Sequence, residues 1–114
     1  MTRAPRIMRI FLLKTCDTCR KALKALRDAG HDPEVVDIRA DGIPQAEIAR
    51  FHAEFGNRLV NRSARIWRDL DDAERAEDPV TLIGRHPTLM KRPVIDDGAT
   101  LHLGWTEEAR AALL

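Results

Sequence analysis

The chain lacks several features that would assign it to a large class of proteins. None of its apolar runs is long enough to cross a bilayer or to form the core of a signal peptide. Its 19 basic and 18 acidic residues leave a net charge of +1, which argues against a broad nucleic-acid or membrane surface. It has no internal repeat and no low-complexity segment. From 114 residues we expect one domain, 1–114, acting as a monomer without direct contact to membranes or nucleic acids.

Cysteine is scarce, and its two copies stand three residues apart. Cys16 and Cys19 lie between the apolar run 10–13 and a helix-patterned stretch, 20–30. A zinc site usually takes four ligands, yet there is no second cysteine pair and the four histidines are scattered, so we expect no metal. Covalent haem is excluded as well, because Arg20 occupies the position where the haem motif has histidine.

Two interpretations of the cysteine pair remain. Free cysteines are among the most buried residues, so both could be core residues at a helix start. At the opening turn of a helix, however, the sulfurs lie near the positive end of the dipole, which stabilises a thiolate. We favour redox chemistry, with Cys16 as the nucleophile, helped by Arg20 one turn away, and Cys19 as the resolving partner. Such a pair without a secretion signal is typical of a reducing compartment, and we expect the cytoplasm.

The apolar pattern predicts an α/β chain that begins strand, helix, strand. The expected elements of the first half are a strand at 8–13, a helix at 20–30, a strand at 35–38 and a helix from Pro44 that buries Ile48, Phe51 and Phe55. A loop with short helices over 56–77 and a helix capped by Asp78 and ending near His86 should follow. The chain should close with strands at 93–95 and 100–103 around an Asp-Gly turn and a last helix capped by Thr106. This order is that of a thioredoxin-like mixed sheet with a helical insertion, about 43–86, between the second strand and the C-terminal hairpin. Ligands of α/β sheets bind beyond the carboxyl ends of strands, where the Cys16 turn is expected.

A second motif surrounds Arg92 and Pro93. A proline that opens a strand is often cis, and it would aim the preceding arginine beyond the strand end. A guanidinium near a thiolate would provide a site for an anion. The alternative is that Lys91 and Arg92 are solvated and Pro93 only begins an edge strand.

Together the two motifs resemble the arsenate reductase (ArsC)/Spx family, in particular the ArsC-like branch that includes YffB. The resemblance rests on 16–22 and 89–94, and the stretch 59–70 is also similar, so it spans nearly the whole chain. It implies a thioredoxin-like fold with a helical insertion, a nucleophilic Cys16, an anion-binding Arg92 and a cis Pro93.

The glutaredoxin-coupled arsenate reductases of this family use one catalytic cysteine and three arginines. Arg92 matches one of the three, whereas Asn61 stands where the first is expected and 101–105 offers no arginine for the last. Arg62 is a candidate substitute, as are Arg58 and Arg65.

These arginines recur, with Arg68, at three- and four-residue spacing and could share one helical face. That face could form an anion-binding lip, but we favour a solvated face paired with nearby acidic residues.

We therefore expect an enzyme, a thiol oxidoreductase that reduces arsenate or another small electrophile. Cys16 and Cys19 would carry the chemistry with Arg92, and Arg92, Pro93, Arg20 and Arg62 would surround the anion. No bound cofactor is expected; glutathione or a dithiol protein, glutaredoxin or thioredoxin, would supply the electrons. The alternative is an Spx-like redox-sensing regulator that binds RNA polymerase, with the two cysteines as its switch.

Overall fold

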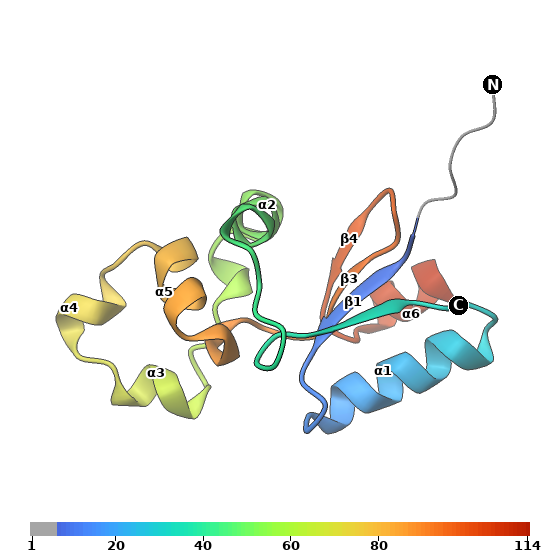
Figure 1. The fold of residues 1–114 in the computed structure, drawn as a ribbon, viewed down its shortest axis with the longest axis horizontal. Coiled ribbons are helices and arrows are strands. Elements are labelled where there is room, and N and C mark those ends of the chain that lie inside the picture. Colours follow the sequence, from blue (N-terminus) through green and yellow to red (C-terminus); the bar gives the residue numbers. More distant parts are fainter. Residues whose placement is uncertain (1–6) are drawn as a thin grey trace. The chain divides into compact units, whose positions relative to one another are not determined.

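The computed structural model describes residues 7–114, which form an α/β chain (Figure 1). In chain order the elements are β1 (Arg9–Leu12), α1 (Asp17–Asp28), β2 (Glu34–Asp37), α2 (Gln45–Phe55), the 3-10 helix η1 (Gly56–Leu59), α3 (Arg65–Asp69), α4 (Asp72–Arg75), α5 (Pro79–Arg85), the 3-10 helix η2 (Pro87–Leu89), β3 (Val94–Asp96), β4 (Leu101–Leu103) and α6 (Glu107–Leu113). In this described part of the chain, no helix is long and apolar enough to span a membrane.

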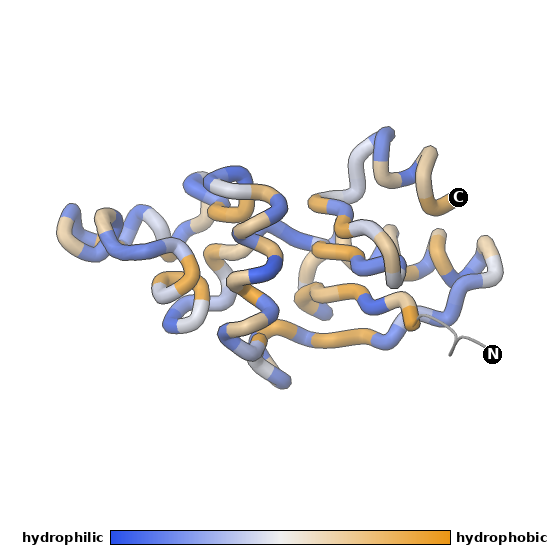
Figure 2. Tube along the Cα trace, turned by 90° about the horizontal axis from the view of Figure 1, so that it is seen from above, coloured by the Kyte–Doolittle hydropathy of each residue, from blue (hydrophilic) through white to orange (hydrophobic). Residues whose placement is uncertain are grey.

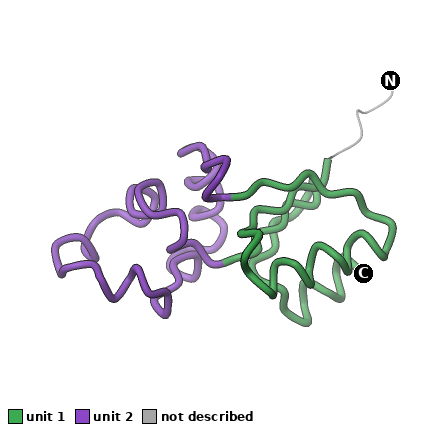
Figure 3. Tube along the Cα trace, turned by 60° about the horizontal axis from the view of Figure 1, so that its bottom comes forward, with its two compact units in different colours: residues 1–37, 92–114 green, residues 38–91 purple. Residues whose placement is uncertain are grey.

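The chain divides into two compact units (Figure 3). Of the described residues, the first unit contains the sheet, α1 and α6 and is built from 7–37 and 92–114, and the second is the helical segment 38–91. The predicted insertion, about 43–86, falls inside the second unit. That unit extends beyond the predicted insertion at both ends. At its C-terminal end, Met90 bridges Val60 and the Lys91 amide donates to the Leu59 carbonyl at 2.8 Å, so both residues are tied to the middle of the unit.

The sheet has the strand order β2-β1-β3-β4 and is mixed. β1 runs parallel to β2, with Leu12 opposite Asp37, and antiparallel to β3, with Phe11 opposite Val94. β3 and β4 form the predicted antiparallel hairpin. The predicted thioredoxin-like mixed sheet is therefore confirmed.

One core of the first unit lies between the sheet and its helices. Ile10 and Leu12 alternate along β1 onto one face, as the period of a strand requires. Ala22 and Leu26 recur along α1 at helical spacing and pack against them. Hydrophobic residues accordingly follow the strands in Figure 2, while the helices alternate between hydrophobic and hydrophilic positions.

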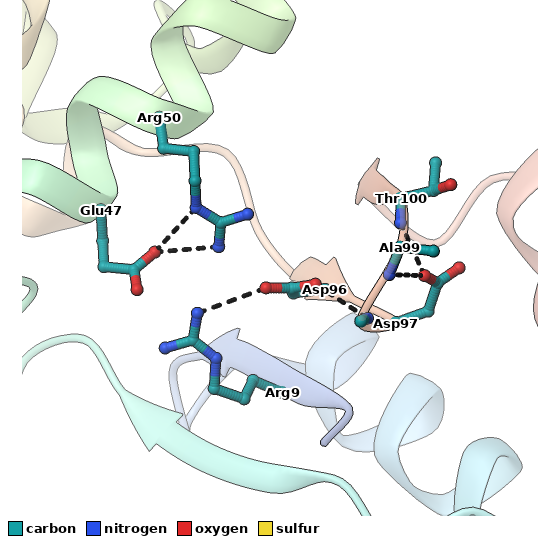
Figure 4. Close-up of polar contacts among 8 residues, drawn as sticks. Arg9, Glu47, Arg50, Asp96, Asp97, Ala99 and Thr100 are labelled. Carbon is teal, nitrogen blue, oxygen red and sulfur yellow. Dashed lines mark hydrogen bonds and ion pairs between the residues drawn. The ribbon is translucent and has the colours of Figure 1, made fainter. Parts of the chain in front are cut away.

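Side chains at the hairpin turn satisfy its backbone amides (Figure 4). Asp97 Oδ1 accepts from the amides of Ala99 and Thr100 at 2.8 and 2.7 Å. Gly98 has a φ of +94°, a conformation that favours glycine, so the Asp-Gly signal marked the turn correctly.

The second unit is held by capped helices with apolar faces. Asp78 caps α5 by accepting from the Thr81 amide, as predicted, and Asp71 and Glu74 form a capping box at α4. α2 buries Ile48 and Phe51.

The predicted start of the first helix was wrong. It begins at Asp17 and not at residue 20, because Cys16 is extended and serves as its N-cap. The stretch 56–77 is a loop with short helices, as predicted, and the possible common helical face of its arginines does not form. Val60 pairs with Met90 and the Asn61 side chain accepts from the Ser63 amide, so the chain is not helical again until α3.

Candidate functional site

The turn between β1 and α1 presents the first cysteine. The Cys16 amide donates to the Leu13 carbonyl, and the Cys16 carbonyl accepts from the Arg20 amide, both at 3.0 Å. Cys16 therefore closes the turn and begins the helix at the same time. As the N-cap of α1, Cys16 lies at the N-terminus of that helix. Its side chain is half-buried, so the sulfur has partial access to solvent.

Cys19 lies in the first turn of α1 and is fully buried in the apolar core of the first unit. Both thiols are free. Burial raises the pKa of Cys19 to about 12, with the neighbouring Cys16 sulfur acting in the same direction. Cys19 is therefore a protonated thiol at neutral pH.

The environment of Cys16 has the opposite net effect. Partial burial works to raise its pKa, but the backbone amide and side chain of Cys19, the Arg92 guanidinium and the Thr18 amide outweigh burial. The pKa of Cys16 is therefore lower than that of an ordinary thiol, and more of it is thiolate at neutral pH.

Arg92 reaches this turn through strand pairing. Val94, the first residue of β3, pairs with Phe11 near the end of β1, and Arg92 stands two residues before it. The Arg92 guanidinium lies near enough to Cys16 to lower the pKa of that thiol. The Arg92–Pro93 peptide bond is cis, as the resemblance implied. Pro93 is buried, and its carbonyl accepts from the Gly104 amide at 2.8 Å.

The other predicted site residues have different surroundings. Arg20 is exposed and forms an ion pair with Asp17 within α1. Arg62 belongs to the second unit, where its guanidinium lies 5.8 Å from the centroid of the Trp67 ring. Their roles toward an anion stay predictions.

Asp37 is a residue of this region that the sequence analysis overlooked. It ends β2 next to the end of β1, is 7% exposed, and accepts from the Lys14 amide at 3.3 Å in the turn that carries Cys16. The signal was available, since a carboxylate interrupts the apolar run 35–38.

Comparisons with known proteins agree with this geometry. The model of the ArsC family matches residues 11–113. An uncharacterized protein of Haemophilus influenzae is 35% identical over 105 residues, which cover 87% of this chain and 91% of that protein. The global transcriptional regulator Spx of Streptococcus mutans is 24% identical, with 92% of this chain and 81% of that protein covered.

Solved structures show the same relationship. A protein named YFFB superposes with a TM-score of 0.86 at 30% identity, covering 94% of this chain and 98% of its own. An arsenate reductase (ArsC) related protein from Brucella melitensis gives 0.71 at 27% identity, with 97% of each chain covered. A glutaredoxin from Archaeoglobus fulgidus shares the fold alone, with a TM-score of 0.50 at 21% identity and coverage of 93% and 83%. The chain with this cysteine turn belongs to the ArsC family.

Proposed function

We propose that this protein is a thiol-dependent reductase in which the Cys16 thiolate attacks a small electrophile. The observation that carries the proposal is the surroundings of the Cys16 sulfur. Two backbone amides, the Cys19 thiol and the Arg92 guanidinium all favour its ionised form. The thiolate is the nucleophilic form of cysteine, so these groups prepare Cys16 for attack at neutral pH.

Arg92 has a second role in this proposal. Its cation acts on Cys16 from two residues before β3, so it can also stabilise negative charge on a group held next to the sulfur. An oxyanion such as arsenate fits that combination. Buried Pro93 fixes the backbone from which Arg92 extends, and Arg20 is proposed to add positive charge around the anion.

The reduction of arsenate at this site balances with two thiols. The Cys16 sulfur bonds to arsenic, and one arsenic oxygen leaves as water after protonation. A second thiol then attacks the Cys16 sulfur, the electron pair of the S–As bond stays on arsenic, and arsenite departs with a disulfide left behind. Glutathione or a dithiol protein in a reducing compartment such as the cytoplasm restores Cys16.

The second thiol is either Cys19 or glutathione, and the products differ. Attack by Cys19 leaves an internal disulfide, whereas glutathione leaves a mixed disulfide on Cys16. Mass spectrometry of the protein after mild oxidation, with and without glutathione, separates them. Absence of an internal disulfide would remove the resolving role of Cys19.

The direct test is a glutaredoxin-coupled assay with arsenate and glutathione. Wild type should consume glutathione in an arsenate-dependent reaction, and Cys16→Ser should lose that reaction entirely. Wild type without activity would reject arsenate as the substrate. The same assay with a small disulfide in place of arsenate then tests the wider proposal of thiol reduction.

A second function is supported by the Spx relative of Streptococcus mutans, with which 92% of this chain aligns. In this alternative, oxidation of Cys16 and Cys19 controls binding to RNA polymerase. A pull-down with reduced and oxidised protein decides between the two. A regulator should bind only in one redox state, lose that dependence in Cys16→Ser, and show no turnover.

A further inference from the structure

We propose that Cys16 and Cys19 also form a binding site for one soft monovalent metal ion, Cu(I), held by both sulfurs. This inference does not depend on the proposed reductase activity, because it uses the same thiols in a different reaction. It follows from the placement of the two cysteines in one helical turn, the number of donors near them and the charge around them.

One helical turn carries both cysteines. Cys16 precedes α1 as its N-cap, and Cys19 is the third residue of the helix. Cys16 also packs against the core cluster that contains Cys19. One metal ion can bridge the two sulfurs in this arrangement without unwinding the helix.

The number of donors selects the kind of ion. Within residues 7–114, no third cysteine, histidine or carboxylate gathers with the pair into a group that could hold a metal. Structural zinc takes four ligands, and calcium and magnesium take six or more oxygens, so two sulfurs serve none of them well. Thiolates are soft ligands that select Cu(I), an ion that is stable with only two donors.

The surrounding charge suits the complex that would form. Two thiolates and one Cu(I) carry a net charge of −1. Arg92 and the amides of Thr18 and Cys19, which favour negative charge on the Cys16 sulfur, would stabilise that anion. Binding is a ligand exchange: the thiol protons leave to the buffer, two S–Cu bonds form, and copper remains Cu(I).

The pair is also shielded on one side. Cys19 has no exposed surface, whereas Cys16 is half-buried, so an ion delivered from solvent meets Cys16 first. Transfer to the second sulfur then places the ion against the apolar core, where water competes poorly as a ligand.

The test is an anaerobic titration of the reduced full-length protein with Cu(I) in the presence of a coloured Cu(I) chelator, followed by native mass spectrometry. Wild type should take one Cu(I) per chain away from the chelator. Cys16→Ser and Cys19→Ser should each lose this competition. Arg92→Met should bind about tenfold more weakly, as expected for a group outside the ligand shell.

Thr18→Ala is the matched control. The Thr18 side chain is exposed and stands between the two cysteines in the sequence, and the substitution removes that side chain but keeps the backbone amide. It should bind as wild type does, and circular dichroism should show that every variant is folded. One copper per two chains, or a Cys19→Ser variant that competes as well as wild type, would overturn the proposal. Because the titration uses no reductase substrate, copper binding by a protein inactive in the reductase assay would reject only the proposed function.

Discussion

Two identical side chains in one helical turn acquire opposite acidities. Cys16 lies at the N-cap of α1, where amides and Arg92 stabilise its thiolate, so its pKa falls. Cys19 lies in the apolar core, where an ionised sulfur is poorly solvated, so its pKa rises. At the scale of single residues, the site therefore consists of one ready nucleophile and one protonated neighbour.

Removal of the guanidinium of Arg92 should weaken the Cys16 thiolate. Arg92→Met should raise the pKa of Cys16, since the cation that favours the ionised sulfur is lost. The ultraviolet absorbance of the thiolate, followed against pH, should shift its midpoint upward, and iodoacetamide should react more slowly at neutral pH.

Arg20→Met is the matched control for that measurement. Arg20 pairs with Asp17, and it is not among the groups that lower the pKa of Cys16. An equal shift in both variants would show that the effect comes from general positive charge and not from Arg92.

Short elements of this fold depend on carboxylates that bind backbone amides. In the β3–β4 hairpin, Asp97 accepts from two amides, and its Oδ2 lies 2.9 Å from His102 Nε2. Partial burial acts to raise the pKa of Asp97, but the His102 side chain and the amides of Thr100 and Ala99 lower it overall. At the scale of the element, one side chain thus organises a turn between strands of three residues each.

Asp97→Ala should lower the free energy of unfolding by about 0.5–1.5 kcal/mol at neutral pH, since the Ala99 and Thr100 amides lose their acceptor. The pKa of Asp97 is depressed in the folded state, so its stabilisation is present above the ordinary value of 3.8 and is lost as the pH falls through the folded pKa. Urea unfolding should show the gap between variant and wild type narrowing in acid.

Asp32→Ala, which removes an exposed carboxylate before β2, is the control for that experiment. It should leave stability nearly unchanged at neutral pH. A gap for Asp97→Ala that stays constant down to acidic pH would contradict the role of the ionised carboxylate.

The cap of α5 gives a second test at this scale. Asp78→Ala should cost about 1 kcal/mol of unfolding free energy, because the Thr81 amide loses the oxygen it donates to. Asp78→Asn should recover most of that loss, since asparagine caps helices equally well. Equal losses in both variants, measured by thermal unfolding, would point to charge and not to capping.

At the scale of the whole molecule, a single chain builds two compact units, one from a discontinuous pair of segments and one from the segment between them. The first unit needs both ends of the chain, because β3, β4 and α6 complete a sheet that β1 and β2 begin. Its core includes Cys19, so the stability of this unit and the environment of the thiols depend on the same packing.

Leu26→Ala tests that dependence. Leu26 is fully buried on the same face of α1 as Cys19 and Ala22, so its truncation should cost about 2–5 kcal/mol of unfolding free energy. Hydrogen exchange should rise in α1 peptides, and the Cys19 thiol should become easier to alkylate. Arg27→Ala, an exposed neighbour, should change stability by no more than about 0.5 kcal/mol.

The parts of the fold that depend on local chemistry were predictable. The caps Asp78 and Thr106 and the Asp-Gly turn were identified because each acts on amides within a few residues. The loop with short helices over 56–77 was also predicted, but not the contact that this stretch makes with a distant segment. The distant partner Met90 draws Val60 into a β-bridge, and no local pattern reveals such a contact.

The sequence by itself determined the order of strands and helices and the position of two cysteines at a helix start, because periodicity, turn residues and caps act over short distances. Only the tertiary structure decided how the cysteines differ and what stands beside them. Pairing of β1 with β3 carries Arg92 to the Cys16 turn, and packing of α1 removes Cys19 from water. Both effects depend on contacts between residues far apart in the chain. The nearby Arg92 charge helps to lower the pKa of Cys16, and burial in the core raises the pKa of Cys19.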